Sequence, residues 1–127
     1  MTSVDDVQSN FQQIKKFLEQ IRSTDSQVKI AFFPENCLYM RIKEGEAVRG
    51  LELQDQVFQD LRKLVVEHGI ALHLGSLPLN DQGKLSNATV FIDLDGAIQT
   101  TYKKIHLFDI ELDGHKPIRE SDVYGHG

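Results

Sequence analysis

The chain has 127 residues, of which 40% are hydrophobic and 26% charged, and this composition is typical of one ordinary globular domain. Its formal net charge is -5 and its basic residues are scattered, so we expect no nucleic acid partner. Because the longest apolar stretches are too short for a bilayer and the first residues lack a secretion-signal pattern, we expect no membrane partner and a cytoplasmic location.

Hydrophobic spacing predicts a helix and then a strand in the first part of the chain. Apolar residues three and four positions apart begin at Val7 and form the stripe of an amphipathic helix, and residues 3–6 resemble a capping box at its start. Residues 28–33 are a nearly unbroken apolar run that ends at Pro34. Such a run predicts a strand that is buried on both faces.

A polar loop follows, and the pattern of apolar residues after it predicts a second helix and a second strand. Helical spacing returns over residues 53–65 and ends at Gly69, a common helix-terminating residue. The apolar run 70–77 predicts another buried strand. The Asn, Asp and Gly residues within 78–86 predict a surface turn.

The sequence pattern in the last part of the chain predicts a β-hairpin followed by a loop. Residues 87–94 and 97–105 flank Asp95-Gly96, which is a strong hairpin signal. Residues 109–127 are polar and rich in turn-forming residues, so we expect a long loop. Helices that alternate with buried strands indicate an α/β fold, here with a mixed sheet because the hairpin is antiparallel.

Two charged side chains stand where apolar strands end. Glu35 follows the first predicted strand, at the edge of an open α/β sheet where ligands usually bind, and Lys104 lies near the end of the hairpin. A carboxylate can move protons and an ammonium can stabilise a developing oxyanion, so we expect the two side chains to converge to about salt-bridge distance. The alternatives are a solvated loop carboxylate and a lysine that extends from the sheet edge into water.

The single cysteine, Cys37, cannot form an internal disulfide and fits a reducing compartment. A neighbouring carboxylate raises the pKa of a thiol, and the histidines are remote in sequence, so we interpret Cys37 as buried and inert. The alternative is a small independent hydrolase in which Cys37 is the nucleophile.

No metal or cofactor site is predicted. His106, His115 and His126 lack the spacing of a zinc site. Residues 109–120 nearly match a calcium-binding loop, but Glu111 stands where the pattern needs Asp or Asn, and a strand precedes the segment. The glycines form no phosphate-binding loop.

Several segments also match one family in type, order and spacing: residues 1–10, the Phe-Pro-Glu-Asn string at 33–36, the hairpin segment 87–96, and the lysine motif at 102–109. Together they resemble the nitrilase superfamily of carbon-nitrogen hydrolases, and the lysine motif is the most specific of them. The resemblance implies that residues 1–127 are the N-terminal part of one α-β-β-α sandwich domain, with a mixed sheet and helices on one face. The family's first strand and C-terminal half are then expected to be missing.

The same resemblance implies a cofactor-free amidase that acts on a small carboxylic acid amide, in the branch of Nit proteins and small ω-amidases. Glu35 would be the general base, Lys104 would stabilise the oxyanion, and Glu120 would support the lysine. The nucleophilic cysteine of the family follows the lysine on a later elbow, so we expect no nucleophile in this chain and no activity from the chain alone. The full-length form is expected to be a homo-oligomer. The alternative is a non-catalytic truncated homologue that acts as a binding or assembly module.

Overall fold

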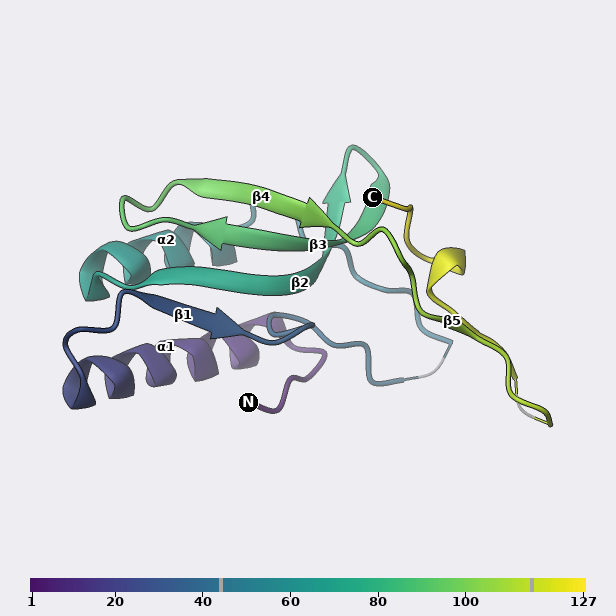
Figure 1. Cartoon of the computed structure of the whole chain (residues 1–127), viewed down its shortest axis with the longest axis horizontal. Helices are drawn as coiled ribbons and strands as arrows, with labels where there is room; N and C mark the ends of the chain where they lie inside the picture. Colours follow the sequence, from purple (N-terminus) through teal and green to yellow (C-terminus); the bar gives the residue numbers. More distant parts are fainter. Residues whose placement is uncertain (44, 115) are drawn as a thin grey trace.

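The computed structural model describes residues 1–43, 45–114 and 116–127. Its central feature is a four-stranded mixed sheet in the order β1-β2-β3-β4, with two helices packed against one face (Figure 1). Strand β1 is parallel to β2, whereas β2, β3 and β4 are antiparallel neighbours. The predicted α/β class, with a mixed sheet and helices on one face, is therefore confirmed. The main elements are α1 (Val7–Thr24), β1 (Ile30–Phe33), α2 (Gln56–His68), β2 (Ala71–Asp81), β3 (Lys84–Ile92) and β4 (Ile98–Lys103).

Helix α1 forms where the apolar spacing predicts it. Its stripe, which includes Phe11, Ile14 and Leu18, is buried against the sheet. The predicted capping box is wrong in detail, because Asp6 is itself the N-cap and its side chain accepts a hydrogen bond from the amide of Ser9 at 2.7 Å.

Strand β1 lies at the edge of the sheet and is buried on one face only, so the prediction of burial on both faces is wrong. Ala31 and Phe33 point toward the helices and are buried, whereas Phe32 is 69% exposed on the opposite face. The side chains of a strand alternate between faces, and the described helices cover only one of them. The apolar run therefore supplies a core face and an open apolar face.

Helix α2 ends as predicted. Gly69 adopts a left-handed conformation with φ of 62°, and its amide donates to the carbonyl of Val65 at 2.7 Å. A side chain at such a φ is strained, which explains why glycine stands at this helix end.

The surface turn predicted over residues 78–86 is wrong, because β2 and β3 pair through most of this segment. Leu79 lies opposite Ser86, and the turn is reduced to Gln82 and Gly83, both with positive φ. Pro78 has no amide hydrogen, but its carbonyl accepts a hydrogen bond from the amide of Leu51 at 2.7 Å. The pairing between β2 and β3 thus outweighs the local preference of the Asn, Asp and Gly residues for a turn.

The predicted hairpin is confirmed as β3 and β4, with a longer connection than two residues. Ile92 pairs with Ile98, and between them the carboxylate of Asp93 accepts hydrogen bonds from the amides of Asp95 and Ala97 at 3.1 and 2.8 Å. An Asp side chain that binds nearby backbone amides stabilises a turn of this kind.

Residues 109–127 are not one loop, as predicted, because they contain a small second sheet and a helical turn. The elements are β5 (Asp109–Ile110), β6 (Ile118–Arg119) and the 3-10 helix η1 (Glu120–Asp122). The carboxylate of Asp109 accepts hydrogen bonds from the amide and the hydroxyl of Ser121, at 3.1 and 2.7 Å. These contacts join the two ends of the segment and place η1 beside the main sheet (Figure 1).

Candidate active site

Glu35 and Lys104 meet at one end of the main sheet. Strands β1 and β4 run in the same direction, since β1 is parallel to β2 and each later pair is antiparallel. Glu35 follows β1 and Lys104 follows β4, so both lie beyond the carboxyl ends of their strands. Glu35 Oε1 and Lys104 Nζ are 3.5 Å apart, which confirms the predicted convergence.

The carboxylate of Glu35 is held through one of its two oxygens. Its Oε1 accepts hydrogen bonds from Asn87 Nδ2 at 2.7 Å, Ser76 Oγ at 3.4 Å and Lys104 Nζ at 3.5 Å. Among the described residues, no hydrogen bond reaches Oε2. The side chain is half exposed, with 49% of its surface accessible. Protein donors therefore hold one carboxylate oxygen, and the other has no such bond among the described residues, which suits a proton-accepting group.

The backbone after β1 contributes to this arrangement. The amide of Asn36 donates to the carbonyl of Ser76 at 2.7 Å, and Asn36 itself has a positive φ of 57°. An Asn tolerates this left-handed conformation better than most residues. The turn brings the Glu35 side chain across β2 toward β3.

Lys104 lies between two carboxylates. Its Nζ is 2.9 Å from Glu120 Oε2 and 3.5 Å from Glu35 Oε1. Burial by itself lowers the pKa of Lys104, but the hydrogen bond to Glu120 and the charges of Glu35 and Glu120 outweigh burial and raise the pKa above its ordinary value. The ammonium is therefore charged at neutral pH and can oppose negative charge that develops nearby.

Glu120 joins the C-terminal segment to the site. Its Oε2 accepts a hydrogen bond from the amide of Phe108 at 2.7 Å as well as the contact from Lys104. The amide of Glu120 in turn donates to the carbonyl of Phe108 at 3.1 Å. Nearby, burial and then the charge of Glu120 raise the pKa of Tyr124 to about 12, so this phenol stays neutral.

Cys37 is separate from this group of charges. It is fully buried in the hydrophobic core. Burial raises the pKa of its thiol to about 12, so almost no thiolate exists at neutral pH. The structure thus agrees with the interpretation of Cys37 as an inert core residue and speaks against its use as a nucleophile.

Three carboxylates of the calcium-like segment are engaged with other protein groups. Asp109 binds Ser121, Glu111 pairs with Arg119, and Glu120 binds Lys104. Within residues 1–43, 45–114 and 116–127, no group of three or more His, Cys, Asp or Glu side chains could hold a metal ion. His115 lies outside the described residues. Of the described helices, none is long and apolar enough to cross a membrane.

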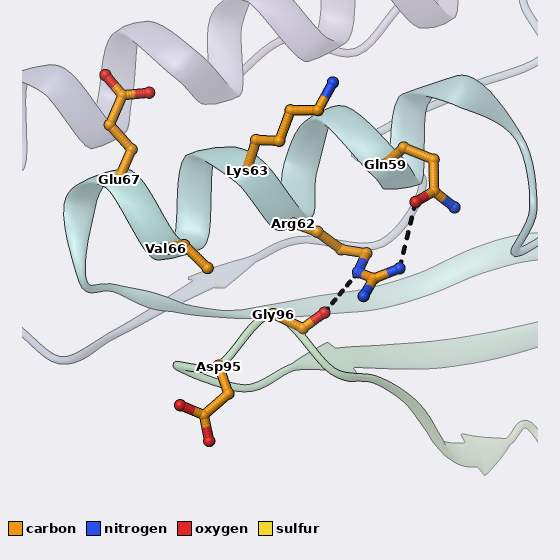
Figure 2. Close-up of a pocket in the computed structure, with 7 residues that line it drawn as sticks. All are labelled: Gln59, Arg62, Lys63, Val66, Glu67, Asp95 and Gly96. Carbon is orange, nitrogen blue, oxygen red and sulfur yellow. Dashed lines mark hydrogen bonds between the residues drawn. The ribbon is translucent and has the colours of Figure 1, made fainter.

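A hollow lies at the end of the sheet opposite Glu35 and Lys104, between α2 and the β3–β4 turn. Its lining residues are Gln59, Arg62, Lys63, Val66, Glu67, Asp95 and Gly96. Figure 2 shows the guanidinium of Arg62 directed at the turn, where its Nε donates to the carbonyl of Gly96 at 2.7 Å. The charged groups of Lys63, Glu67 and Asp95 point apart from one another. Among the residues that line this hollow, no carboxylate is paired with a basic side chain.

Sequence reasoning missed two residues that hold the site, Asn87 and Ser76. Asn87 is a buried polar residue within the largely apolar strand β3, and that position was a usable signal. Ser76 is partly buried in β2 and gave no signal of its own. In both cases the acceptor, Glu35, is more than forty positions away in sequence.

Comparisons with known proteins identify the family and the fold of the chain. Residues 1–127 match the family model described as carbon-nitrogen hydrolase. The chain is 31% identical to the nitrilase and fragile histidine triad fusion protein NitFhit of Caenorhabditis elegans, over 96% of this chain and 28% of that protein. It is 39% identical to human omega-amidase NIT2 over 54% of this chain and 25% of that protein.

A solved structure shares the fold. The crystal structure of C. elegans NitFhit superposes with a TM-score of 0.81 at 27% sequence identity, covering 100% of this chain and 31% of that one. The chain thus spans less than a third of the length of these three matches.

Proposed function

The chain belongs to the carbon-nitrogen hydrolase family, and from this premise we propose that it supplies the base and the oxyanion-stabilising cation of an amidase for small carboxylic acid amides. The observation that carries the proposal is the position of Lys104 Nζ, 3.5 Å from Glu35 Oε1 and 2.9 Å from Glu120 Oε2, beyond the carboxyl ends of two strands.

In the proposed reaction, Glu35 acts first as a base and then as an acid. Its carboxylate takes the proton of a cysteine thiol, and the resulting thiolate attacks the amide carbon. The negative charge that forms on the carbonyl oxygen is stabilised by the ammonium of Lys104. Glu35 then protonates the amide nitrogen as the carbon-nitrogen bond breaks, which releases ammonia and leaves a thioester. Water hydrolyses the thioester after losing a proton to Glu35, which regenerates the thiol and releases the acid.

We propose that the nucleophile is not Cys37 but a cysteine outside these 127 residues. A thiol that is fully buried, with its pKa raised to about 12, supplies neither access nor thiolate. The 127 residues alone are then inactive. The proposed substrates are ω-amides of short dicarboxylic acids, because human omega-amidase NIT2 is among the relatives. A cytoplasmic location and a homo-oligomeric full-length form complete the proposal.

Ammonia release from glutaramate and succinamate by the full natural gene product that contains these residues tests the proposal. Wild type should release ammonia, and Glu35→Gln should lower kcat/KM by about 10²–10⁴-fold because the base is lost. Glu52→Gln is the matched control, since Glu52 also accepts an amide hydrogen bond, from Asn80 at 3.3 Å, away from the site. An E35Q protein with wild-type turnover would exclude this role. No ammonia release from any small amide would instead favour a binding or assembly module.

A further inference from the structure

Asn87 is a buried polar residue that contacts both halves of the proposed catalytic pair. It lies in β3, an inner strand of the sheet, and only 2% of its surface is exposed. Its side-chain Nδ2 donates to Glu35 Oε1 at 2.7 Å, and its backbone carbonyl accepts the amide of Lys104 at 2.8 Å. One residue thus binds the carboxylate on one side and the lysine backbone on the other.

The contact with Asn87 is the shortest of the three that fix Glu35. The bond from Ser76 Oγ, at 3.4 Å, is long for a hydroxyl donor, and the ion pair with Lys104 spans 3.5 Å at a half-exposed carboxylate. Partly exposed ion pairs at such distances are screened by solvent and hold a side chain weakly. In addition, the ammonium of Lys104 lies closer to Glu120 than to Glu35. Without Asn87, Glu35 keeps only the two weaker contacts.

The orientation of the Asn87 amide supports this interpretation. Turning the amide over would place Oδ1 against the carboxylate of Glu35, so only the orientation with Nδ2 toward Glu35 is favourable. In that orientation Oδ1 is buried and has no hydrogen-bond partner among the described residues. An unpaired buried acceptor costs free energy that an apolar side chain of similar size would avoid. The hydrogen bond from Asn87 Nδ2 to Glu35 is the favourable contact that offsets this cost.

We infer that Asn87 is a positioning residue that holds the Glu35 carboxylate and the Lys104 backbone in one arrangement. Asn87 binds Oε1, which leaves Oε2 to exchange protons with the reacting groups. Among the described residues its side chain has no hydrogen bond to the ammonium of Lys104, and in the proposed reaction it does not touch the substrate. The inference rests on the proposed function for its catalytic meaning, but the positioning itself is measurable without any reaction.

The test is the titration of the Lys104 amine, followed by NMR in the full natural gene product with ¹³C-labelled lysine and assigned with Lys104→Arg. Glu35→Gln should lower the pKa of Lys104, because one of its two facing carboxylates loses its charge. Asn87→Ala should lower it in the same direction, because the carboxylate is no longer held beside the ammonium. In the Glu35→Gln background, Asn87→Ala should cause no further fall.

Two further variants separate positioning from general damage to the fold. Asn87→Leu keeps the branched shape of the side chain and the backbone carbonyl but removes the donor, and it should reproduce the effect of Asn87→Ala. Asn80→Ala is the matched control, because Asn80 also donates its amide to a glutamate, Glu52, and it should leave the titration unchanged. Equal Lys104 titrations in wild type, N87A and N87L would overturn the inference. So would a fall that simply adds to that of E35Q.

In the complete amidase, Asn87→Ala should lower kcat by about 10- to 100-fold, with little change in KM, because a misplaced base slows the reaction without removing a substrate contact. A KM effect alone would contradict the inference. An amidase that is never detected, together with the expected titrations, would overturn the proposed function and leave the positioning role intact.

Discussion

The two ends of the main sheet carry charges of both signs but hold them differently. At the carboxyl ends of β1 and β4, Lys104 lies between two carboxylates, and a buried amide fixes one of them. At the other end, Arg62 binds the carbonyl of Gly96, and the surrounding charged groups point apart (Figure 2). Charged residues around a hollow therefore do not by themselves bring an acid and a base together. The first end differs because its opposite charges are paired and the buried side chain of Asn87 holds one of them.

The largest expected effect separates two adjacent lysines. In the full natural gene product, Lys104→Ala should reduce kcat/KM by about 10²–10³-fold, because the oxyanion loses its cation. Lys103 forms an ion pair with Asp81, at the end of β2, whose length of 3.5 Å equals that of the Lys104–Glu35 pair. Lys103→Ala should therefore change kcat/KM by less than about twofold. Equal losses in the two variants would remove the distinction between a reactive end and ordinary surface charge.

The next prediction concerns Cys37, which lies in the hydrophobic core. Because burial raises its pKa to about 12, iodoacetamide at pH 7.5 should label the native thiol more slowly than the urea-unfolded thiol, by a factor on the order of 10² or more. Mass spectrometry of quenched samples measures both rates. Rapid, stoichiometric labelling of the native chain would show that the thiol is accessible and would restore Cys37 as a candidate nucleophile.

At the end of the sheet that holds Arg62, the variant Arg62→Ala should lower the stability and leave the turnover unchanged. The variant loses the hydrogen bond from Arg62 Nε to Gly96, which should lower the free energy of unfolding by about 1–2 kcal/mol in urea titrations. The Lys104 titration and the turnover of the full protein should stay at their wild-type values. A change in either would mean that the two ends are coupled.

The smallest expected effect is a pH dependence of stability at the end of the sheet that holds Lys104. The pKa of Lys104 is raised in the folded chain, so its contribution to stability is present below the unfolded pKa and is lost as pH rises through the folded pKa. The difference in unfolding free energy between wild type and Lys104→Met, expected to be below about 1 kcal/mol, should shrink over that alkaline range. Lys103→Met serves as the control. A difference that grows with pH would have the wrong sign.

The parts of the fold that follow local periodicity were predictable from sequence. The apolar stripe that begins at Val7, the stop at Gly69 and the hairpin turn at Gly96 each depend on residues close together in the chain. The convergence of Glu35 and Lys104 was also predictable, because both follow apolar strands that were expected in one sheet.

Other features of the fold and of the site depend on contacts with segments that are distant in sequence. Local sequence patterns do not say which distant segment makes the contact. The polar residues near Asn80 suggested a turn, but pairing with β3 extends the strand. The exposure of the Phe32 side chain depends on which faces of the sheet are covered by other elements. The role of Asn87 depends on an acceptor in a loop 52 positions away.

The most direct test of the account is a double-mutant cycle on ammonia release, with wild type, Glu35→Gln, Lys104→Ala and the double variant in the full natural gene product. If the two side chains act as one catalytic unit, the double variant should lose little more kcat/KM than the more damaging single variant. Losses that multiply across the cycle would show that the two residues act independently and would contradict the account.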